Sequence, residues 1–213
     1  MKEIIIKAFR IPNKLQTIFY INWNKFIFYI NGIEYGENLK IYNRIYVNKH
    51  QSANITIGNN FTFSSGNSIN PLCRNIRGAI YAPTNSIICI GNNTGISSAC
   101  LWAKEKIIIG NNVKIGGDCI IMDTDAHNLD YMIRNSNKKN NEGKLIDHIT
   151  AESKPISIED NVLIGTRCII LKGVTIGARS IIGSGSIVTK SIPADCIAAG
   201  NPCKVIRYLN NKP

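Results

Sequence analysis

One histidine stands in a sequence that could support acid–base chemistry. His127 ends the run Met-Asp-Thr-Asp-Ala-His, in which Asp123 and Asp125 precede it. An imidazole near its ordinary pKa is partly neutral at neutral pH and can take a proton from a hydroxyl group. We expect Asp125 to orient the ring, with Asp123 as the other candidate. A histidine beside two aspartates is also common as a surface hydrogen-bonding group, so this motif alone leaves both interpretations open.

Metal binding is another use of such residues. His50, His127 and His148 are the three histidines, and their positions show no ligand-like spacing. The seven cysteines occur singly, without a Cys-x-x-Cys pair, which fits neither a zinc site nor a disulfide framework. We therefore predict no metal cofactor, and small buried thiols in a reducing cytoplasm.

The basic charge is concentrated at the two ends of the chain. The formal net charge is +11, and residues 161–213 carry seven basic and one acidic residue. This surplus could attract nucleic acid, but it lies within a regular repeat with little aromatic interleaving, unlike a base-stacking platform. A small polyanion bound beside the repeats explains the charge better, and we expect no nucleic-acid partner.

A six-residue repeat must position these groups. A helix has a period of 3.6 and a simple strand a period of two, so a period of six requires a coil that turns one corner per repeat. Three repeats would close one triangular turn, with neighbouring strands about 4.8 Å apart. Gly165, Gly177 and Gly183 fit cramped or left-handed corners. The sequence predicts an all-β protein, a left-handed parallel β-helix, whose repeating positions are Ile158, Ile164, Ile170, Ile176, Ile182 and Val188.

The same pattern recurs upstream. Ile-Gly-Asn-Asn begins at Ile57, Ile90 and Ile109, and asparagine tolerates the positive φ that such corners require. Ordinary β-hairpin turns are the alternative reading of these corners. We expect the inward positions that follow to be Phe63, Ile69, Ile96, Trp102, Ile115 and Ile121, with Ile33, Leu39 and Ile45 in the same phase.

The repeat predicts one domain with one interruption. We divide the chain into a cap segment 1–32, a β-helix 33–207 with an inserted loop 128–157, and a tail 208–213. Loops inserted at solenoid corners often carry the binding function. Arg134, Lys138 and Lys139 lie in this loop without an intervening acid. They either belong to a solvated loop or contact an anionic glycan, and Arg134 is our candidate for substrate binding.

The first thirty residues are rich in aromatic side chains but contain no apolar run of signal-peptide or transmembrane length. We therefore expect a soluble protein. The aromatic segment could contact a membrane surface or a lipid-linked substrate. A cap on the open end of the β-helix is the more common use of such a segment.

The C-terminal half resembles a known family. Residues from Pro155 to Arg207 read PISIEDNVLIGTRCIILKGVTIGARSIIGSGSIVTKSIPADCIAAGNPCKVIR. This text resembles the hexapeptide-repeat acyltransferases of the galactoside, maltose and Nod-factor acetyltransferase group and their capsular-polysaccharide relatives. With Asp-Thr-Asp-Ala-His, the likeness extends from about residue 88 onward. It implies acetyl-CoA as the co-substrate and His127 as the general base that deprotonates the acceptor hydroxyl.

The resemblance also assigns residues to the coenzyme. Thr189 and Lys190 match a family Thr-Lys pair at the coenzyme, and Lys204 and Arg207 match basic residues near its phosphates. Thr166 and Ser184 match further coenzyme contacts. The basic C-terminal surplus agrees with a ligand that carries several phosphates.

The departures from the family lie on the acceptor side. Leu163 stands where the family often has tryptophan, and Trp102 is not an assured replacement. No asparagine corresponds to one that contacts the acceptor, although Ser97 or Ser98 could supply a hydroxyl, and we assign Ser98 to substrate binding.

Our leading hypothesis is a cytoplasmic, homotrimeric O-acetyltransferase acting on a saccharide, such as a capsular or lipopolysaccharide glycan. In the resembled family the coenzyme lies between adjacent β-helices. Three alternatives stay open: N-acetylation of an amino sugar, O-acetylation of an antibiotic or amino acid, and a non-catalytic β-helix scaffold.

Overall fold

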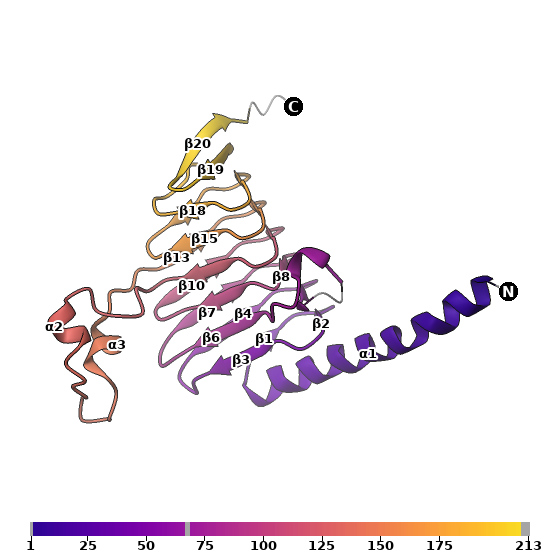
Figure 1. The fold of residues 1–213 in the computed structure, drawn as a ribbon, viewed down its shortest axis with the longest axis horizontal. Coiled ribbons are helices and arrows are strands. Elements are labelled where there is room, and N and C mark those ends of the chain that lie inside the picture. The colour runs from indigo at the N-terminus through magenta and orange to yellow at the C-terminus, as the bar shows by residue number, and fades with distance from the viewer. Residues whose placement is uncertain (1, 67–68, 210–213) are drawn as a thin grey trace.

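Three sheets form the faces of a triangular, left-handed coil (Figure 1). The structure, a computed structural model, describes residues 2–66 and 69–209. Sheet A comprises β1 (Glu34–Tyr35), β4 (Asn54–Ile57), β7 (Ile87–Ile90), β10 (Lys106–Ile109), β13 (Ile156–Ile158) and β16 (Thr175–Ile176). Sheet B comprises β2 (Lys40–Tyr42), β5 (Thr62–Ser64), β8 (Gly95–Ser97), β11 (Lys114–Ile115), β14 (Leu163–Ile164), β17 (Ile181–Ile182), β19 (Cys196–Gly200) and β20 (Cys203–Tyr208). Sheet C comprises β3 (Tyr46–Lys49), β6 (Ala79–Ala82), β9 (Cys100–Trp102), β12 (Ile120–Met122), β15 (Ile169–Leu171) and β18 (Ile187–Val188).

The predicted six-residue repeat forms the core. All six repeating positions from Ile158 to Val188 are buried. Ile158 pairs with Ile176, Ile164 with Ile182 and Ile170 with Val188, which confirms the stacking that the period predicts. Burial of these aliphatic columns is the main stabilising term, because each fully buried side chain of this size contributes about 1.5–3 kcal/mol.

A ladder of side-chain amides stabilises the corner between sheets A and B. The side-chain oxygen of Asn92 accepts from the Asn59 backbone N–H, and that of Asn111 accepts from the Asn92 N–H, both at 2.8 Å. The second asparagine of each Gly-Asn-Asn corner has positive φ, 57° at Asn60, 57° at Asn93 and 56° at Asn112. The Gly-Asn-Asn motif therefore has two functions: the side chain of the first asparagine bonds to the backbone of the preceding coil, and the second asparagine makes the turn.

Two predicted inward positions are wrong. Ile69 is exposed in an excursion of the chain, and Ile80 of β6 is the inward-facing strand residue that follows Phe63 in the coil. Leu101 is fully buried, whereas Trp102 lies on the outer face and packs edge-on against Tyr81. The corner at Ser98 and Ala99 is one residue shorter than a period of six assumes, so the inward position moves from 102 to 101.

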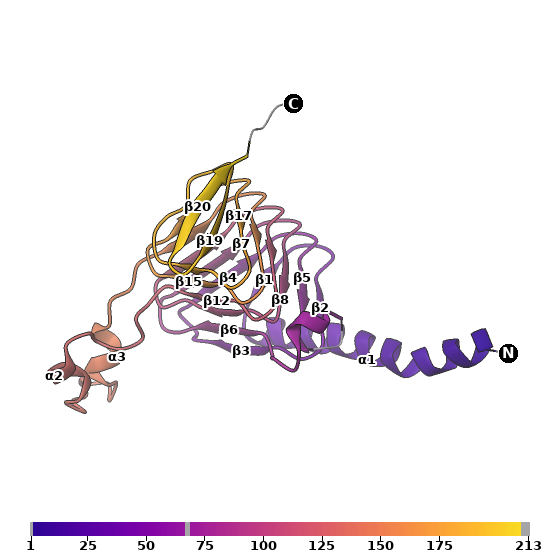
Figure 2. The ribbon, with the colours of Figure 1, turned by 45° about the horizontal axis from the view of Figure 1, so that its top comes forward.

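The predicted cap segment is a long helix, α1 (Lys2–Ile30), although its sequence pattern was not interpreted as helical. Its C-terminal end contacts the first coil, where Phe28 is buried and Asn24 Nδ2 donates to the backbone oxygens of Ile41 and Asn43 at 3.2 and 2.8 Å. The rest of α1 extends away from the coil (Figures 1 and 2). Its exposed apolar side chains include Leu15, Ile18, Phe19, Trp23, Phe26, Tyr29 and Ile30. Within the described residues, no helix is long and apolar enough to cross a membrane.

The coil is interrupted at two corners. The corner excursion, of which residues 65–66 and 69–78 are described, leaves between β5 and β6 at the corner of sheets B and C and includes a 3₁₀ turn, Pro71–Cys73. The histidine loop, residues 123–155, leaves between β12 and β13 at the corner of sheets C and A and contains α2 (Tyr131–Arg134) and α3 (Ile146–Thr150). The two lie on opposite sides of the coil (Figures 1 and 2). Strand pairing continues in register across the longer one, with Ile107 opposite Ile156 and Ile109 opposite Ile158.

Candidate active site

A buried carboxylate anchors the histidine loop where it leaves β12. Asp123 is fully buried, and its side-chain oxygens accept the backbone N–H groups of Lys104, Glu105 and Lys106 at 2.6, 2.8 and 2.6 Å. Burial raises the pKa of this carboxyl because the charged form loses water. Asp123 therefore fixes the start of the loop to the preceding coil.

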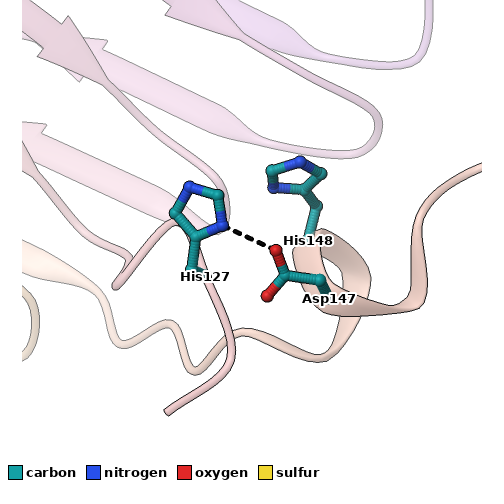
Figure 3. A group of neighbouring side chains, drawn as sticks. All are labelled: His127, Asp147 and His148. Carbon is teal, nitrogen blue, oxygen red and sulfur yellow. Dashed lines mark hydrogen bonds and ion pairs between the residues drawn. The ribbon is translucent and has the colours of Figure 1, made fainter. Parts of the chain in front are cut away.

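The side chain that orients His127 comes from the far end of the loop. Asp147 on α3 places Oδ2 2.6 Å from Nδ1 of His127 and accepts the Asn128 backbone N–H through Oδ1 at 2.7 Å (Figure 3). The His127 side chain is 55% exposed and that of Asp147 is 10% exposed. The hydrogen bond from His127 lowers the pKa of Asp147, so this carboxylate accepts and Nδ1 of His127 must donate. This tautomer leaves Nε2 as the basic nitrogen.

A second histidine lies beside this pair. The rings of His127 and His148 have centroids 4.8 Å apart, and Nδ1 of His148 lies 3.0 Å from the Ala126 carbonyl oxygen. The possible metal-ligating atoms of His127, Asp147 and His148 all lie within 4.8 Å of one another. Both Nδ1 atoms donate to oxygen in this arrangement, because neither a carboxylate nor a carbonyl can donate. The group is therefore a hydrogen-bonded cluster in which each imidazole has its Nδ1 already engaged.

The prediction that Asp125 orients His127 is wrong. Lys172 Nζ lies 2.8 Å from each side-chain oxygen of Asp125 and 3.1 Å from Oε2 of Glu152. These carboxylates raise the pKa of Lys172, with Asp125 as the larger cause. Asp125 is thus part of an ion-pair group that ties the loop to the next coil, and only its backbone oxygen meets His127, by accepting the His127 N–H at 2.7 Å.

Two of the predicted coenzyme residues line one groove. A groove of about 360 Å³ crosses the outer face of sheet B, and Thr166, Ser184 and Leu163 are among its lining residues. Ser184 Oγ accepts the Thr166 backbone N–H at 3.1 Å, which joins two successive coils at this corner. Leu163 is 45% exposed there, in the place where the resemblance leads one to expect an aromatic wall.

A β-bulge brings the two predicted phosphate-binding residues onto one face. In the antiparallel pair of β19 and β20, Arg207 lies opposite Ile197 and Lys204 opposite Ala199, and the register shifts between Ile197 and Ala198. Residues three apart on a regular strand would face opposite sides. Because cross-strand partners share a face, Lys204 and Arg207 both point outward from sheet B.

The other predicted residues lie elsewhere. Thr189 and Lys190 are exposed after β18, at the corner of sheets C and A. Arg134 is exposed on α2, where Nη1 donates to the backbone oxygens of Asn128 and Leu129 at 2.7 and 3.2 Å. The assignment of Ser98 is wrong in its geometry, because its buried hydroxyl accepts the Gly66 N–H at 2.9 Å and so holds the corner excursion. Ser97 is the neighbouring serine that lines the groove.

Sequence reasoning missed Asp147 for a physical reason. It lies 20 residues after His127 in a segment without periodicity, and only the folding of α3 brings the two together. An acid that precedes a histidine on a short helical segment, as Asp147 precedes His148, is the signal that could have suggested it.

Comparisons with known proteins agree with the repeat. Residues 155–190 match the family described as hexapeptide repeat of succinyl-transferase. The galactoside O-acetyltransferase of Escherichia coli K12 is 42% identical over 134 residues, which cover 62% of this chain and 60% of that protein.

Two solved structures are similar at a TM-score of 0.50 each. One is a hexapeptide-repeat acetyltransferase of Vibrio cholerae O1 biovar eltor complexed with acetyl-coenzyme A, 34% identical, with 58% of this chain and 61% of that chain covered. The other is a maltose O-acetyltransferase of Clostridium difficile 630, 36% identical, with 58% and 60% covered. The chain thus spans less than two thirds of each of these proteins. Over the shared coils, this chain is similar to these acetyltransferases.

Proposed function

We propose that this protein is an acetyl-CoA-dependent O-acetyltransferase that acts on a saccharide hydroxyl, in a capsular or lipopolysaccharide glycan. The observation that carries the proposal is the hydrogen bond of 2.6 Å between His127 Nδ1 and Asp147 Oδ2, which joins the two ends of the histidine loop. It leaves a half-exposed imidazole with Nε2 free to act as a base. The similarity to named acetyltransferases supports acetyl transfer as the reaction.

The reaction needs no covalent enzyme intermediate. Nε2 of His127 takes the proton of the acceptor hydroxyl as its oxygen attacks the thioester carbonyl carbon. The tetrahedral intermediate then expels the coenzyme thiolate, which receives that proton from the imidazolium. Asp147 stabilises the imidazolium between the two steps, because an ionised carboxylate beside Nδ1 favours the charged ring. The products are an acetyl ester and the free thiol.

The coenzyme would bind along sheet B and its corner with sheet C. Thr166 and Ser184 line the groove there, and Lys204 and Arg207 present two positive charges on the outward face of β20. Guanidinium and ammonium groups are suited to phosphate oxygens. We assign Thr189 and Lys190 to the same ligand across a subunit interface.

A homotrimer would complete the site. In one chain, His127 stands at the corner of sheets C and A, whereas Thr166 and Ser184 stand at the corner of sheets B and C. The whole of sheet C separates the two corners. A neighbouring subunit that places its histidine loop beside the groove would bring base and coenzyme together. We propose that the trimer works in the cytoplasm, where the seven free thiols would stay reduced.

The decisive experiment measures transfer from labelled acetyl-CoA to simple sugars, amino sugars and acidic polysaccharides. We expect an acetyl ester with wild type and a rate about 10²–10⁴-fold lower for His127→Ala. His50→Ala is the matched control, because His50 is exposed and bonds to Ser52 beside another coil. If His127→Ala keeps more than about a tenth of the rate, the base assignment fails. An amide product would favour an N-acetyltransferase, and no coenzyme binding would favour a scaffold.

Subunit complementation tests the shared site. Mixed trimers of His127→Ala with the double variant Lys204→Ala, Arg207→Ala should regain activity, because one interface then combines an intact histidine loop with an intact β20. If the mixed trimers stay inactive, the whole site would lie within one chain.

A further inference from the structure

A second groove meets the first at the corner of sheets B and C. It has a volume of about 430 Å³. Pro71, Leu72 and Arg74 of the corner excursion form one side, and Thr166, Arg167 and Ser184 are on the other. Thr166 and Ser184 line both grooves, so a molecule in one groove would reach the other.

Two guanidinium groups in this second groove share one carboxylate. Arg74 Nη2 lies 2.9 Å and Arg167 Nε 3.8 Å from the same oxygen of Asp118. The Arg74 and Arg167 side chains are 56% and 59% exposed. Within the described part of the chain, Asp118 is the one side chain that pairs with either guanidinium. The group therefore has a net positive charge and unused N–H donors at the groove.

The backbone that carries Arg74 is held firmly in place. Arg74 has φ of 48° and ψ of −138°, a combination that is unfavourable for a residue with a side chain and that clusters at ligand-binding positions. Hydroxyl groups hold both ends of the excursion: Ser98 Oγ accepts the Gly66 N–H at 2.9 Å, and Ser65 Oγ accepts the Gly78 N–H at 3.0 Å. A guanidinium fixed before binding loses less entropy when it binds.

The contact with the coil is close as well. A Cβ on Gly117 would lie 3.1 Å from the Leu72 carbonyl oxygen, so the excursion packs directly against a position without a side chain. Asn70 Oδ1 accepts the Leu72 N–H at 3.0 Å and starts the 3₁₀ turn that leads to Arg74. The local fold thus brings a basic side chain from the excursion to a basic side chain of the corner after β14.

We propose that Arg74 and Arg167 form an oxyanion-binding subsite for a carboxylate or phosphate group of a molecule bound in the transferase site. A guanidinium presents paired N–H donors that match two oxygens of such a group. Asp118 orients Arg74 and lowers the repulsion between the two arginines. This inference deepens the proposed function and rests on it only for the identity of the bound molecule. The group belongs either to an acidic acceptor sugar or to the coenzyme.

Direct binding separates the two sources without acetyl transfer. Titration calorimetry would compare glucuronate with glucose and CoA with dephospho-CoA, using wild type, Arg74→Gln and Arg167→Gln. We expect either variant to weaken one of the anionic ligands about tenfold, while its neutral or dephosphorylated counterpart changes less than about twofold. Loss of glucuronate affinity assigns the subsite to the acceptor, and loss of CoA affinity assigns it to the coenzyme.

A matched control is available at another corner. Arg179 pairs with Asp195 and is exposed to a similar extent, 53%, so Arg179→Gln should leave both affinities unchanged. Arg167→Gln keeps the test valid if Arg74→Gln fails to fold. The proposal is overturned if wild type does not prefer the anionic member of either pair, or if both variants bind as wild type does. Anion binding through Arg74 in a protein without transferase activity would refute the proposed function and leave this inference standing.

Discussion

The two interruptions of the coil are held in different ways. The corner excursion lies against the coil, fixed by serine hydroxyls and by close packing on Gly117. The histidine loop projects outward and is tied at its base by charged groups, with Asp123 on one side and Lys172 on the other. The first arrangement shapes a groove wall, whereas the second presents His127 beside solvent. The two insertions therefore differ in where they are anchored as well as in length.

The largest expected effect separates Asp147 from Asp125, both in the histidine loop. Asp147→Ala should lower kcat about 10²-fold, because His127 loses the partner that fixes its tautomer, while the KM for acetyl-CoA stays near the wild-type value. Asp125→Ala should lower kcat less, because its carboxylate contacts Lys172. Steady-state kinetics across pH would measure both. A greater loss of kcat in Asp125→Ala than in Asp147→Ala would instead favour Asp125 as the residue that orients His127.

The sequence predicts some parts of the fold and of the candidate site and fails at others. The period of six predicts the inward columns from Ile158 to Val188, because every coil there has the same length. The period also predicts where the histidine loop lies, because the repeat stops over this segment. The period gives a wrong prediction at Ile69, because this apolar residue has the expected phase although it belongs to the corner excursion.

Other features were not predicted from the sequence, for different reasons. Helix α1 was not predicted although its exposed apolar side chains, among them Leu15, Ile18 and Trp23, recur at helical spacing. The buried Phe28 lies on the opposite face, so apolar residues are spread along both faces of the segment. The bulge that aligns Lys204 with Arg207 is a local register shift that composition does not reveal. Contacts such as His127 with Asp147 join segments without a repeat, so only their three-dimensional arrangement identifies them.

The next effect concerns the anchor of the longer insertion. Asp123→Ala should lower the free energy of unfolding by about 3 kcal/mol or more, because three backbone N–H groups lose a buried acceptor. Asp123→Asn keeps one carbonyl oxygen and should lose less. Urea unfolding monitored by circular dichroism would measure the difference. Equal stability of Asp123→Ala and wild type would show that this anchor contributes little.

The matching change in the shorter insertion should be smaller. Ser98→Ala removes one of the two acceptors of the buried Gly66 N–H, which also donates to the Ile76 carbonyl oxygen at 3.0 Å, and should cost about 0.5–1.5 kcal/mol. The same urea titration measures it, with Ser157→Ala on the outer face of sheet A as the control, because Ser97 Oγ itself accepts from Asn70 Nδ2 of the excursion at 3.3 Å. A larger loss in Ser98→Ala than in Asp123→Ala would reverse the comparison of the two anchors.

Gly117→Ala should alter the corner excursion alone. The added Cβ would press on the Leu72 carbonyl, so we expect a loss of about 1 kcal/mol or a small outward shift of the 3₁₀ turn. His127 chemistry should be spared, so kcat should fall less than in Asp147→Ala. A crystal structure and a melting curve of the variant would test this; an unshifted turn with unchanged stability would contradict it.

Lowering the pH should destabilise the histidine loop before it destabilises the corner excursion. His127 lowers the pKa of Asp147, and Lys154 and Lys172 lower that of Glu152. A lowered folded-state pKa means that the stabilisation is present above the ordinary carboxyl pKa of about 4 and is lost as pH falls through the lowered values. Hydrogen exchange, corrected for intrinsic rates, should therefore rise in residues 128–150 before it rises in 70–78. Simultaneous loosening would indicate that the serine-held excursion also depends on ionised groups.

The unbroken register across the histidine loop has an evolutionary consequence. β10 pairs with β13 as though the intervening loop were absent. Closing a longer loop adds only about 0.6 kcal/mol for each doubling of its length. Lineages can therefore lengthen, shorten or exchange this segment while every column of the coil keeps its neighbours. Apart from anchors such as Asp123, the stacking of the columns and the length of this loop are therefore specified by separate parts of the chain.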